Sequence, residues 1–227
     1  MSFDLGDILV QYFCLLFSLC VHEAAHAAMA NWCGDPSARL LGRMTIDPRK
    51  HIDPLGTVVL PLIMMTTGAQ FLFGWAKPVP FNPSNLNNYR RDPVLIAIAG
   101  PLSNIAIALT SVVLLRISLM AYDGGMTSEA LIVIIQILGG MIMINMVLAL
   151  FNMIPLPPLD GHHVLNYFLP PKGQEMMRKV GPFGIIIAIL LVVPILQTPI
   201  MYTIILMLTL SSWGVMDLQD AFAIIFG

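Results

Sequence analysis

The chain has 227 residues, of which 57% are hydrophobic and only 11% are charged. A soluble globular domain carries about 25% charged residues, so 11 basic and 13 acidic side chains are too few to cover a water-exposed surface of this size. The net charge of −2 argues against a nucleic-acid binder, which needs a basic face. These numbers predict an integral membrane protein and argue against a soluble enzyme, a disordered tail and a coiled coil.

Long, mainly apolar segments recur along the chain, and the first covers residues 8–33, with no charge before Glu23. A transmembrane helix needs about 20 predominantly apolar residues to cross roughly 30 Å of hydrocarbon. This segment is long enough, and it ends at a Gly-Asp-Pro sequence, which terminates helices. Its N-terminal flank carries Asp4 and Asp7 but no basic residue, so we expect a retained transmembrane helix rather than a cleaved signal peptide.

Further spans are expected later in the chain. Segments 94–120 and 129–153 each predict one transmembrane helix. The last uncharged segment, 180–216, would be about 55 Å long as a single helix, nearly twice the thickness of the hydrocarbon core. Pro194 and Pro199 interrupt it, so we predict two short spans, at 181–197 and 199–215.

The apolar segment at 55–74 contains Pro61 and continues into an extended, proline-rich sequence that ends at Phe81. Basic residues indicate its topology, because they accumulate on the cytoplasmic side of a membrane protein. Ten of the eleven basic residues lie in three connections: Arg39, Arg43, Arg49 and Lys50; Lys77, Arg90 and Arg91; and Lys172, Arg178 and Lys179. All ten lie on one side only if the segment 55–81 enters the membrane and returns as a re-entrant hairpin.

The sequence therefore predicts an all-α polytopic membrane protein. We expect a single membrane-embedded domain over residues 1–227, with about five transmembrane helices and a re-entrant hairpin that contains a short β-like segment. Irregular backbone at membrane depth is tolerated only where it is buried in protein or lines a wet cavity. The hairpin therefore implies a cavity inside the helical bundle.

The first span carries the motif His22-Glu23-Ala24-Ala25-His26, an H-E-x-x-H sequence. Residues four apart share one face of a helix, so both imidazoles can bind a single metal ion. Glu23 can reach a metal-bound water without being a ligand itself. The alternative is a set of polar side chains that join helices, but ionisable groups inside a membrane are costly and usually functional.

Two histidines do not complete a catalytic zinc site, which needs a third protein ligand and an open position for water. Asp160 is the only acidic residue between Glu129 and Glu175, and it follows a proline-rich break after the span 129–153. The predicted topology brings it to the same side of the membrane as His22 and His26. His162 or His163 is the alternative third ligand, since both follow directly after Gly161.

Two asparagines in the predicted spans each allow two roles, one in the active site and one in helix packing. Asn152 lies eight residues before Asp160 and is expected to face the cavity, where its amide could stabilise an oxyanion or hold the substrate backbone. An interhelical hydrogen bond is the other role for Asn152. Asn104 carries the same two possibilities, with a packing role favoured.

Three motifs together resemble the site-2 protease family of intramembrane zinc metalloproteases. They are His22-Glu23-Ala24-Ala25-His26, Gly100-Pro101-Leu102-Ser103-Asn104, and the segment from Asn152 to Gly161 that reads N-M-I-P-L-P-P-L-D-G. The resemblance implies one zinc ion per chain, held by His22, His26 and Asp160, with Glu23 as the catalytic base. It also implies a re-entrant β-like segment after the first motif helix and cleavage of membrane-spanning peptides.

The expected function is therefore hydrolysis of peptide bonds in transmembrane segments, with Glu23 and Asn152 as the catalytic residues. The expected partners are a transmembrane or membrane-associated protein substrate and the lipid bilayer, without nucleic acid. We expect a multi-pass protein of the cell (inner) membrane whose active site faces the cytoplasmic side. The alternative function is a membrane transporter in which the histidines and Glu23 form a proton or metal pathway, although the paired repeats typical of transporters are not visible.

Overall fold

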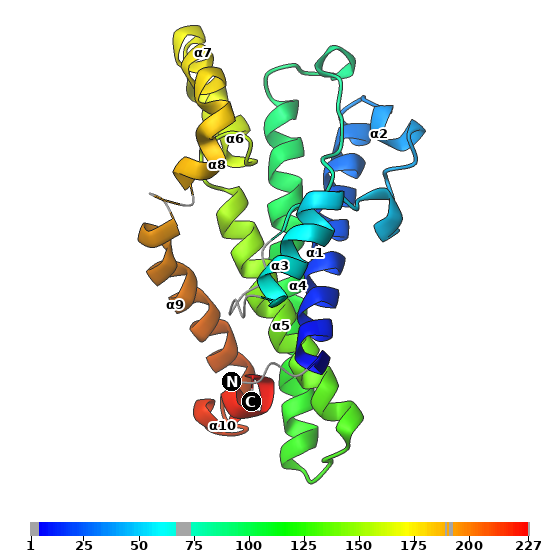
Figure 1. The fold of residues 1–227 in the computed structure, drawn as a ribbon, viewed down its shortest axis with the longest axis vertical. Coiled ribbons are helices and arrows are strands. Elements are labelled where there is room, and N and C mark those ends of the chain that lie inside the picture. The colour runs from blue at the N-terminus through cyan, green and yellow to red at the C-terminus, as the bar shows by residue number, and fades with distance from the viewer. Residues whose placement is uncertain (1–4, 67–73, 189, 191–192, 227) are drawn as a thin grey trace.

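The structure is a computed structural model that describes residues 5–66, 74–188, 190 and 193–226. These residues form helices joined by turns and irregular segments (Figure 1). The α-helices are α1 (Leu5–Trp32), α2 (Ser37–Leu40), α3 (Leu60–Thr66), α4 (Asp92–Asp123), α5 (Glu129–Asn152), α6 (Gly161–Phe168), α7 (Pro171–Val180), α8 (Gly184–Ile187), α9 (Val193–Ser212) and α10 (Leu218–Phe226). Short 3-10 turns occur at Pro48–Lys50, Pro83–Asn85 and Gly181–Phe183, and a π-helical turn, η2, covers Pro54–Val59.

Among the described residues, three helices are long and apolar enough to cross a membrane: Ile8–Trp32 within α1, and all of α4 and α5. The segments 8–33, 94–120 and 129–153 are thus helical, and the helix ends agree with the predicted bounds to within a few residues. The helices α4 and α5 pack against each other, and α1 packs against both (Figure 1). These three helices form the framework that holds the candidate site.

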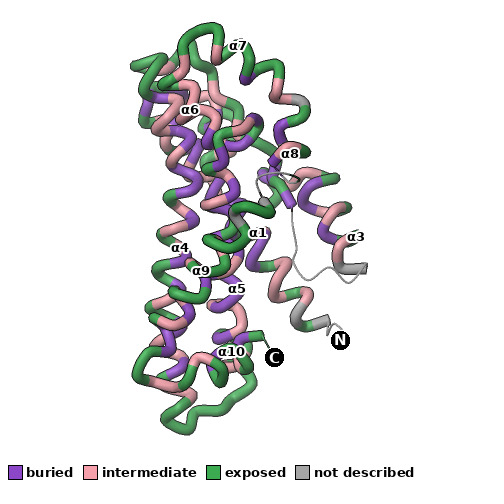
Figure 2. Tube along the Cα trace, turned by 90° about the vertical axis from the view of Figure 1, so that its left-hand side faces the viewer, coloured by how far each residue is buried: buried purple, intermediate pink, exposed green. Residues whose placement is uncertain are grey.

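The helix α4 shows how an apolar helix distinguishes its packed face from its outer face. Buried residues recur every three or four positions along it, as Ile96, Gly100, Asn104, Ala108, Ser111, Leu115 and Leu119. Large apolar side chains between them are exposed, so buried and exposed positions alternate along the helix (Figure 2). A helix that is apolar on all sides suits a position between protein and lipid.

The C-terminal region differs from the prediction, because α9 is one helix that runs through Pro199. The predicted boundary between spans at 197 and 199 is therefore wrong. Pro199 lies inside the helix, where the hydroxyl of Thr203 donates to its carbonyl oxygen at 2.8 Å. Part of the predicted span 181–197 lies outside the described residues.

The chain that follows α3 lies next to the residues at the start of η2. The chain runs through α3, and the backbone N–H of Trp75 then donates to the carbonyl oxygen of Gly56 at 3.3 Å. The N–H of Lys77 donates to the carbonyl oxygen of His51 at 2.8 Å, which fixes the returning chain next to the start of the segment. The predicted β-like segment lies partly outside the described residues, and its described portion, 74–81, is irregular rather than a strand.

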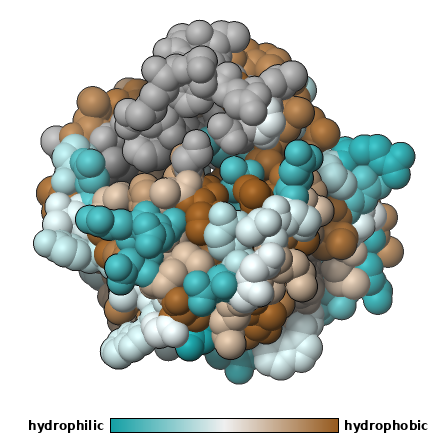
Figure 3. Space-filling view, turned by 90° about the horizontal axis from the view of Figure 1, so that it is seen from below, coloured by the Kyte–Doolittle hydropathy of each residue, from teal (hydrophilic) through white to brown (hydrophobic). Residues whose placement is uncertain are grey.

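The charged connections divide between the two ends of the molecule. The connections with ten of the eleven basic residues lie in the upper half of Figure 1. The α4–α5 turn and α10 lie at the lower end, which is seen from below in Figure 3 as a mixture of polar and apolar residues. Acidic residues belong to this lower end, among them Asp123, Glu129 and Asp220.

Candidate metal centre

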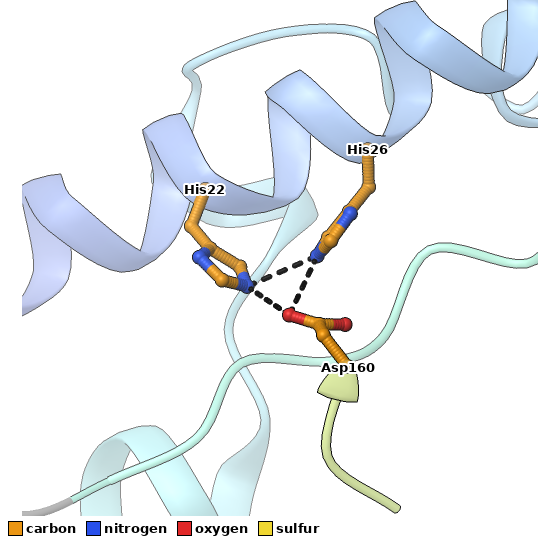
Figure 4. Close-up of side chains that lie close together, drawn as sticks. All are labelled: His22, His26 and Asp160. Atoms are coloured by element: carbon orange, nitrogen blue, oxygen red, sulfur yellow. Dashed lines mark hydrogen bonds and ion pairs between the residues drawn. The ribbon is translucent and has the colours of Figure 1, made fainter. Parts of the chain in front are cut away.

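His22, His26 and Asp160 form the one cluster of potential metal ligands found among the described residues (Figure 4). The Nε2 atoms of the two histidines lie 3.0 Å apart. Oδ2 of Asp160 lies 3.2 Å from Nε2 of His22 and 3.3 Å from Nε2 of His26. Both histidines are buried, at 4% and 8% exposure.

Helix periodicity accounts for the two histidines, and a tight turn accounts for Asp160. His22 and His26 are one turn apart on α1, so their imidazoles share one face. Asp160 stands at the start of α6, after the proline-rich segment that follows α5. A Cβ atom at Gly161 would collide with the backbone of Met153 and Ile154. Glycine therefore permits the close turn that directs the carboxylate back towards α1.

The second nitrogen of each imidazole faces a hydrogen-bond acceptor. Nδ1 of His22 lies 2.6 Å from Oδ1 of Asn104, and Nδ1 of His26 lies 2.7 Å from the carbonyl oxygen of Ile96. An acceptor requires a donor, so both Nδ1 atoms carry a hydrogen. As neutral imidazoles, the form that binds metal, both residues present the lone pair of Nε2 towards each other and towards the carboxylate of Asp160.

Three converging acceptors need a cation between them, and the donor set fits zinc. Oδ2 of Asp160 is buried and has no hydrogen-bond partner, although it lies against two ring nitrogens. We attribute this to the acceptor state of both nitrogens. Tetrahedral zinc with ligand bonds of about 2.0–2.2 Å separates its ligand atoms by roughly 3.3–3.5 Å, close to the observed 3.0–3.3 Å. Two histidines and one carboxylate leave a fourth position open, as in catalytic sites.

The electrostatics of Asp160 agree with a ligand role. Burial raises the pKa of its carboxyl, whereas positive charge on the imidazoles of His22 and His26 lowers it, and the net effect is a pKa below the usual range; a cation held between the three groups acts in the same direction. The carboxyl group is therefore ionised and able to coordinate a cation at neutral pH.

Glu23 lies beside the cluster rather than within it. Its Oε2 atom accepts a hydrogen bond from the backbone N–H of Val79 at 3.0 Å. Val79 belongs to the returning segment 74–81, which is held further along by the N–H of Asn82, donated to Oδ2 of the buried Asp35 at 2.6 Å. Glu23 thus links the H-E-x-x-H helix to the irregular segment 74–81 beside it.

The remaining predicted residues have local partners. Nδ2 of Asn152 donates to the carbonyl oxygen of Leu148 at 3.0 Å, which uses one of its two amide hydrogens. Nδ1 of His162 lies 2.6 Å from the carbonyl oxygen of Leu159. The ring of His163 packs against Phe81 at 5.9 Å between centroids, and burial followed by the neighbouring His162 lowers its pKa to about 4.

Sequence reasoning did not single out Asn145, which is fully buried on α5 and bonded to Asn104. Its only sequence signal is a polar side chain in an uncharged span. The carbonyl oxygen of Ile96 was also missed, because a backbone contact between two helices leaves no residue-type pattern.

An apolar helical protein with a buried cluster of two histidines and a carboxylate on an H-E-x-x-H helix has the features of a membrane metalloprotease. The model of peptidase family M50 matches residues 116–195. The chain is 37% identical over 179 residues to a protein of Bacillus subtilis (strain 168) named "Putative zinc metalloprotease YwhC", which covers 79% of this chain and 78% of that protein. The chain therefore belongs to peptidase family M50, the site-2 protease family.

More distant relatives carry a similar name. The Rip2 protein of Mycobacterium tuberculosis (strain H37Rv) is 28% identical over 176 residues, and its name also describes a zinc metalloprotease. The match covers 78% of this chain but only 63% of that protein. Rip2 of Mycolicibacterium smegmatis is 26% identical over 183 residues, which cover 80% of this chain and 66% of the relative. No solved structure matches the chain with statistical significance.

Proposed function

We propose that the chain is an intramembrane zinc metalloprotease that hydrolyses peptide bonds of transmembrane segments. The observation that carries this proposal is the convergence of three acceptor atoms, from His22, His26 and Asp160, inside a bundle of apolar helices. Membership of a peptidase family and the names of the relatives support the same activity.

In this proposal one zinc ion per chain is held by His22, His26 and Asp160. When bound, zinc supplies Lewis acidity at this position. Glu23 follows His22 directly, so its side chain projects about 100° around the helix from that ligand. Glu23 accepts a proton from the attacking water and returns it to the leaving amine as the peptide bond breaks.

Other residues of the chain hold the substrate. Asn152 retains one amide hydrogen beyond its bond to Leu148, and this hydrogen can stabilise the developing oxyanion or hold the substrate backbone. The substrate must be extended, since a helix engages its carbonyl groups in its own hydrogen bonds. Residues 74–81, the described part of the predicted segment 71–81, lie outside any helix and offer backbone groups for strand-like pairing with an unwound substrate.

The proposed protein is a single membrane-embedded domain that crosses the cell (inner) membrane several times. Because α9 is continuous, we propose four crossings, by α1, α4, α5 and α9, rather than the five predicted from the sequence. The segment 55–81 is re-entrant, which is supported by the hydrogen bond between Trp75 and Gly56. Basic connections at one end and acidic residues at the other support a site that faces the cytoplasm.

The test of this function is a Glu23→Gln variant. The amide is nearly isosteric but cannot take up the proton, so kcat for cleavage of a transmembrane peptide should fall at least about 100-fold while zinc content is unchanged. Purified protein in detergent supplies both measurements from one sample. Glu175→Gln is the matched control, because Glu175 is exposed and pairs only with Lys179 in the described structure. Near-normal cleavage by zinc-loaded Glu23→Gln would show that Glu23 is not the catalytic base. Absence of cleavage by zinc-loaded wild-type protein would instead favour the transporter, in which Glu23 carries protons.

A further inference from the structure

A chain of buried side chains connects the metal centre to the interior of α5. Oδ1 of Asn104, on α4, faces Nδ1 of His22 at 2.6 Å, and Nδ2 of Asn104 donates to Oδ1 of Asn145, on α5, at 2.8 Å. Nδ2 of Asn145 then donates to the carbonyl oxygen of Met141 and to the hydroxyl oxygen of Ser18, each at 2.8 Å. Both asparagines have no exposed surface.

The far end of this chain fixes its direction. A carbonyl oxygen can only accept, so the group of Asn145 that faces Met141 must be the NH2 group. Ser18 donates its own hydrogen to the carbonyl oxygen of Cys14 at 2.6 Å and therefore offers Asn145 an acceptor as well. With its NH2 group committed twice, Asn145 presents its oxygen to Asn104 and so orients the amide of Asn104.

The orientation of Asn104 decides which nitrogen of His22 is free. In the observed orientation, Asn104 accepts the hydrogen on Nδ1 and leaves the lone pair of Nε2 facing Asp160. A rotated amide would present its NH2 group to Nδ1 and place the imidazole hydrogen on Nε2, where it would block a ligand bond. His26 needs no such control, because its Nδ1 faces the backbone carbonyl of Ile96.

We propose that Asn145 is a positioning residue of the metal centre. Through the amide of Asn104 it holds His22 in the tautomer that binds zinc at Nε2. This role rests on the proposed function, since zinc is the ion concerned. Buried asparagines in membrane bundles also serve as plain interhelical contacts, but a plain contact has no required direction, and the two roles therefore predict different results for a paired substitution.

The paired substitution replaces the amide of Asn104, which must be oriented, by a carboxylate, whose two oxygens are equivalent. Asn145→Leu removes the groups that orient Asn104 while keeping a similar volume. Asn104→Asp, added to Asn145→Leu, replaces the amide by a carboxylate, which accepts from Nδ1 of His22 with either oxygen and needs no orientation. Ile142→Ala is the matched control, because Ile142 is fully buried three residues away on the same helix and belongs to the apolar core.

The expected readout is zinc affinity, measured by chelator competition on full-length protein in detergent. Loss of a group that orients a metal-binding histidine costs about 10–100-fold in affinity. We expect a loss of this size in Asn145→Leu, recovery of most of it in the double variant, and unchanged affinity in Ile142→Ala despite a lower thermal unfolding midpoint. A double variant that binds zinc no better than Asn145→Leu would show that the contact only packs helices.

A second measurement uses the wild-type protein, without a substitution in α5. In metal-free wild-type protein labelled with 15N-histidine, Nδ1 of His22 should carry hydrogen, and an unprotonated Nδ1 would overturn the proposal. A wild-type protein that binds no zinc contradicts both the proposed function and this role. If the wild type binds zinc and Asn145→Leu binds it with equal affinity, only the role of Asn145 is contradicted, and the proposed function stands.

Discussion

At the residue scale, Gly100 sets how closely α4 approaches the metal centre. A Cβ atom at Gly100 would overlap the imidazole rings of both His26 and His22. Alanine is the better helix former by about 0.5–1 kcal/mol, so the helix itself should persist in a Gly100→Ala variant. The methyl group has no free space, however, and must displace the two rings.

We therefore expect Gly100→Ala to lower zinc affinity at least tenfold while circular dichroism shows an unchanged helix content. An error of about 1 Å in ligand position is enough for a loss of this size. The control is Ser103→Ala, since Ser103 lies less than one turn away and bonds to the carbonyl oxygen of Gly100. Equal zinc affinity in wild type and Gly100→Ala would show that the rings have room to move.

The third ligand is tested by comparing Asp160→Ala with His162→Ala. Removing Asp160 leaves two imidazoles, which cannot form a closed zinc site, so most of the zinc should be lost on purification. His162 bonds to the carbonyl oxygen of Leu159 and lies outside the ligand cluster, so its loss should leave the zinc content near one per chain. Metal analysis of both purified variants decides the assignment, and the reverse result would make His162 the ligand.

The sequence revealed those site residues whose relationship is local. His22, Glu23 and His26 lie within five positions of one helix, so periodicity alone places them together. Asp160 lies far along the chain, and its approach to the histidines could be predicted only from the topology of the spans. The direction of the Asn104 amide depends on contacts with Asn145 on another helix, and no residue pattern encodes such a contact.

At the element scale, the return of segment 55–81 has a topological consequence. Gly56 and Trp75 are hydrogen-bonded, and the proposed re-entrant topology places the chains before and after this segment on the same side of the membrane. Cysteines introduced at Asp47 and Ser84 should therefore both be protected from an impermeant thiol reagent in intact cells. Thr127→Cys, in the α4–α5 turn, is the control that should be labelled.

Native cysteines should contribute little to this experiment, since Cys14, Cys20 and Cys33 are all buried. Labelling at Ser84 together with protection at Asp47 would mean that the segment crosses the membrane. That outcome would also place Asp160 on the opposite side from His22 and His26, and the metal assignment would fail with the topology.

The helices differ in how well their boundaries could be predicted. For α1, α4 and α5, charged or turn-forming residues flank an uninterrupted apolar run, and the predicted ends agree with the structure to within a few residues. For α9, two prolines suggested a break, yet the helix runs through Pro199, whose carbonyl oxygen accepts from the hydroxyl of Thr203. A proline therefore shows where a helix hydrogen bond is missing, but not whether the helix ends there.

At the scale of the whole molecule, the polar site depends on the apolar bundle around it. The helices α1 and α4 and the segment that follows α5 each supply a ligand or its hydrogen-bond partner. Exposed apolar side chains cover the outer surfaces of the same helices, as expected for contact with lipid. Burial excludes competing water from the converging acceptors, which strengthens their attraction for a cation and raises the cost of leaving them without one.

Zinc should therefore stabilise the entire fold. An ion that binds only the folded state adds about 2.7 kcal/mol when its free concentration is 100 times the dissociation constant. Without zinc, the lone pairs of His22 and His26 face the carboxylate of Asp160 with no cation between them. We expect a chelator to lower the thermal unfolding midpoint of the wild-type protein in detergent, and added zinc to restore it. The intrinsic tryptophan fluorescence can report the transition.

The control for this measurement is Asp160→Ala, which should unfold at one temperature with or without added zinc. A chelator that lowered the midpoint of this variant equally would be acting elsewhere, on lipid or detergent contacts. Suppose that the protein binds zinc in excess zinc, and that its unfolding midpoint is nevertheless the same in chelator. The ion would then contribute nothing to holding α1 against the Asp160 turn. Packing of α1, α4 and α5 alone would then offset the repulsion between the three acceptors.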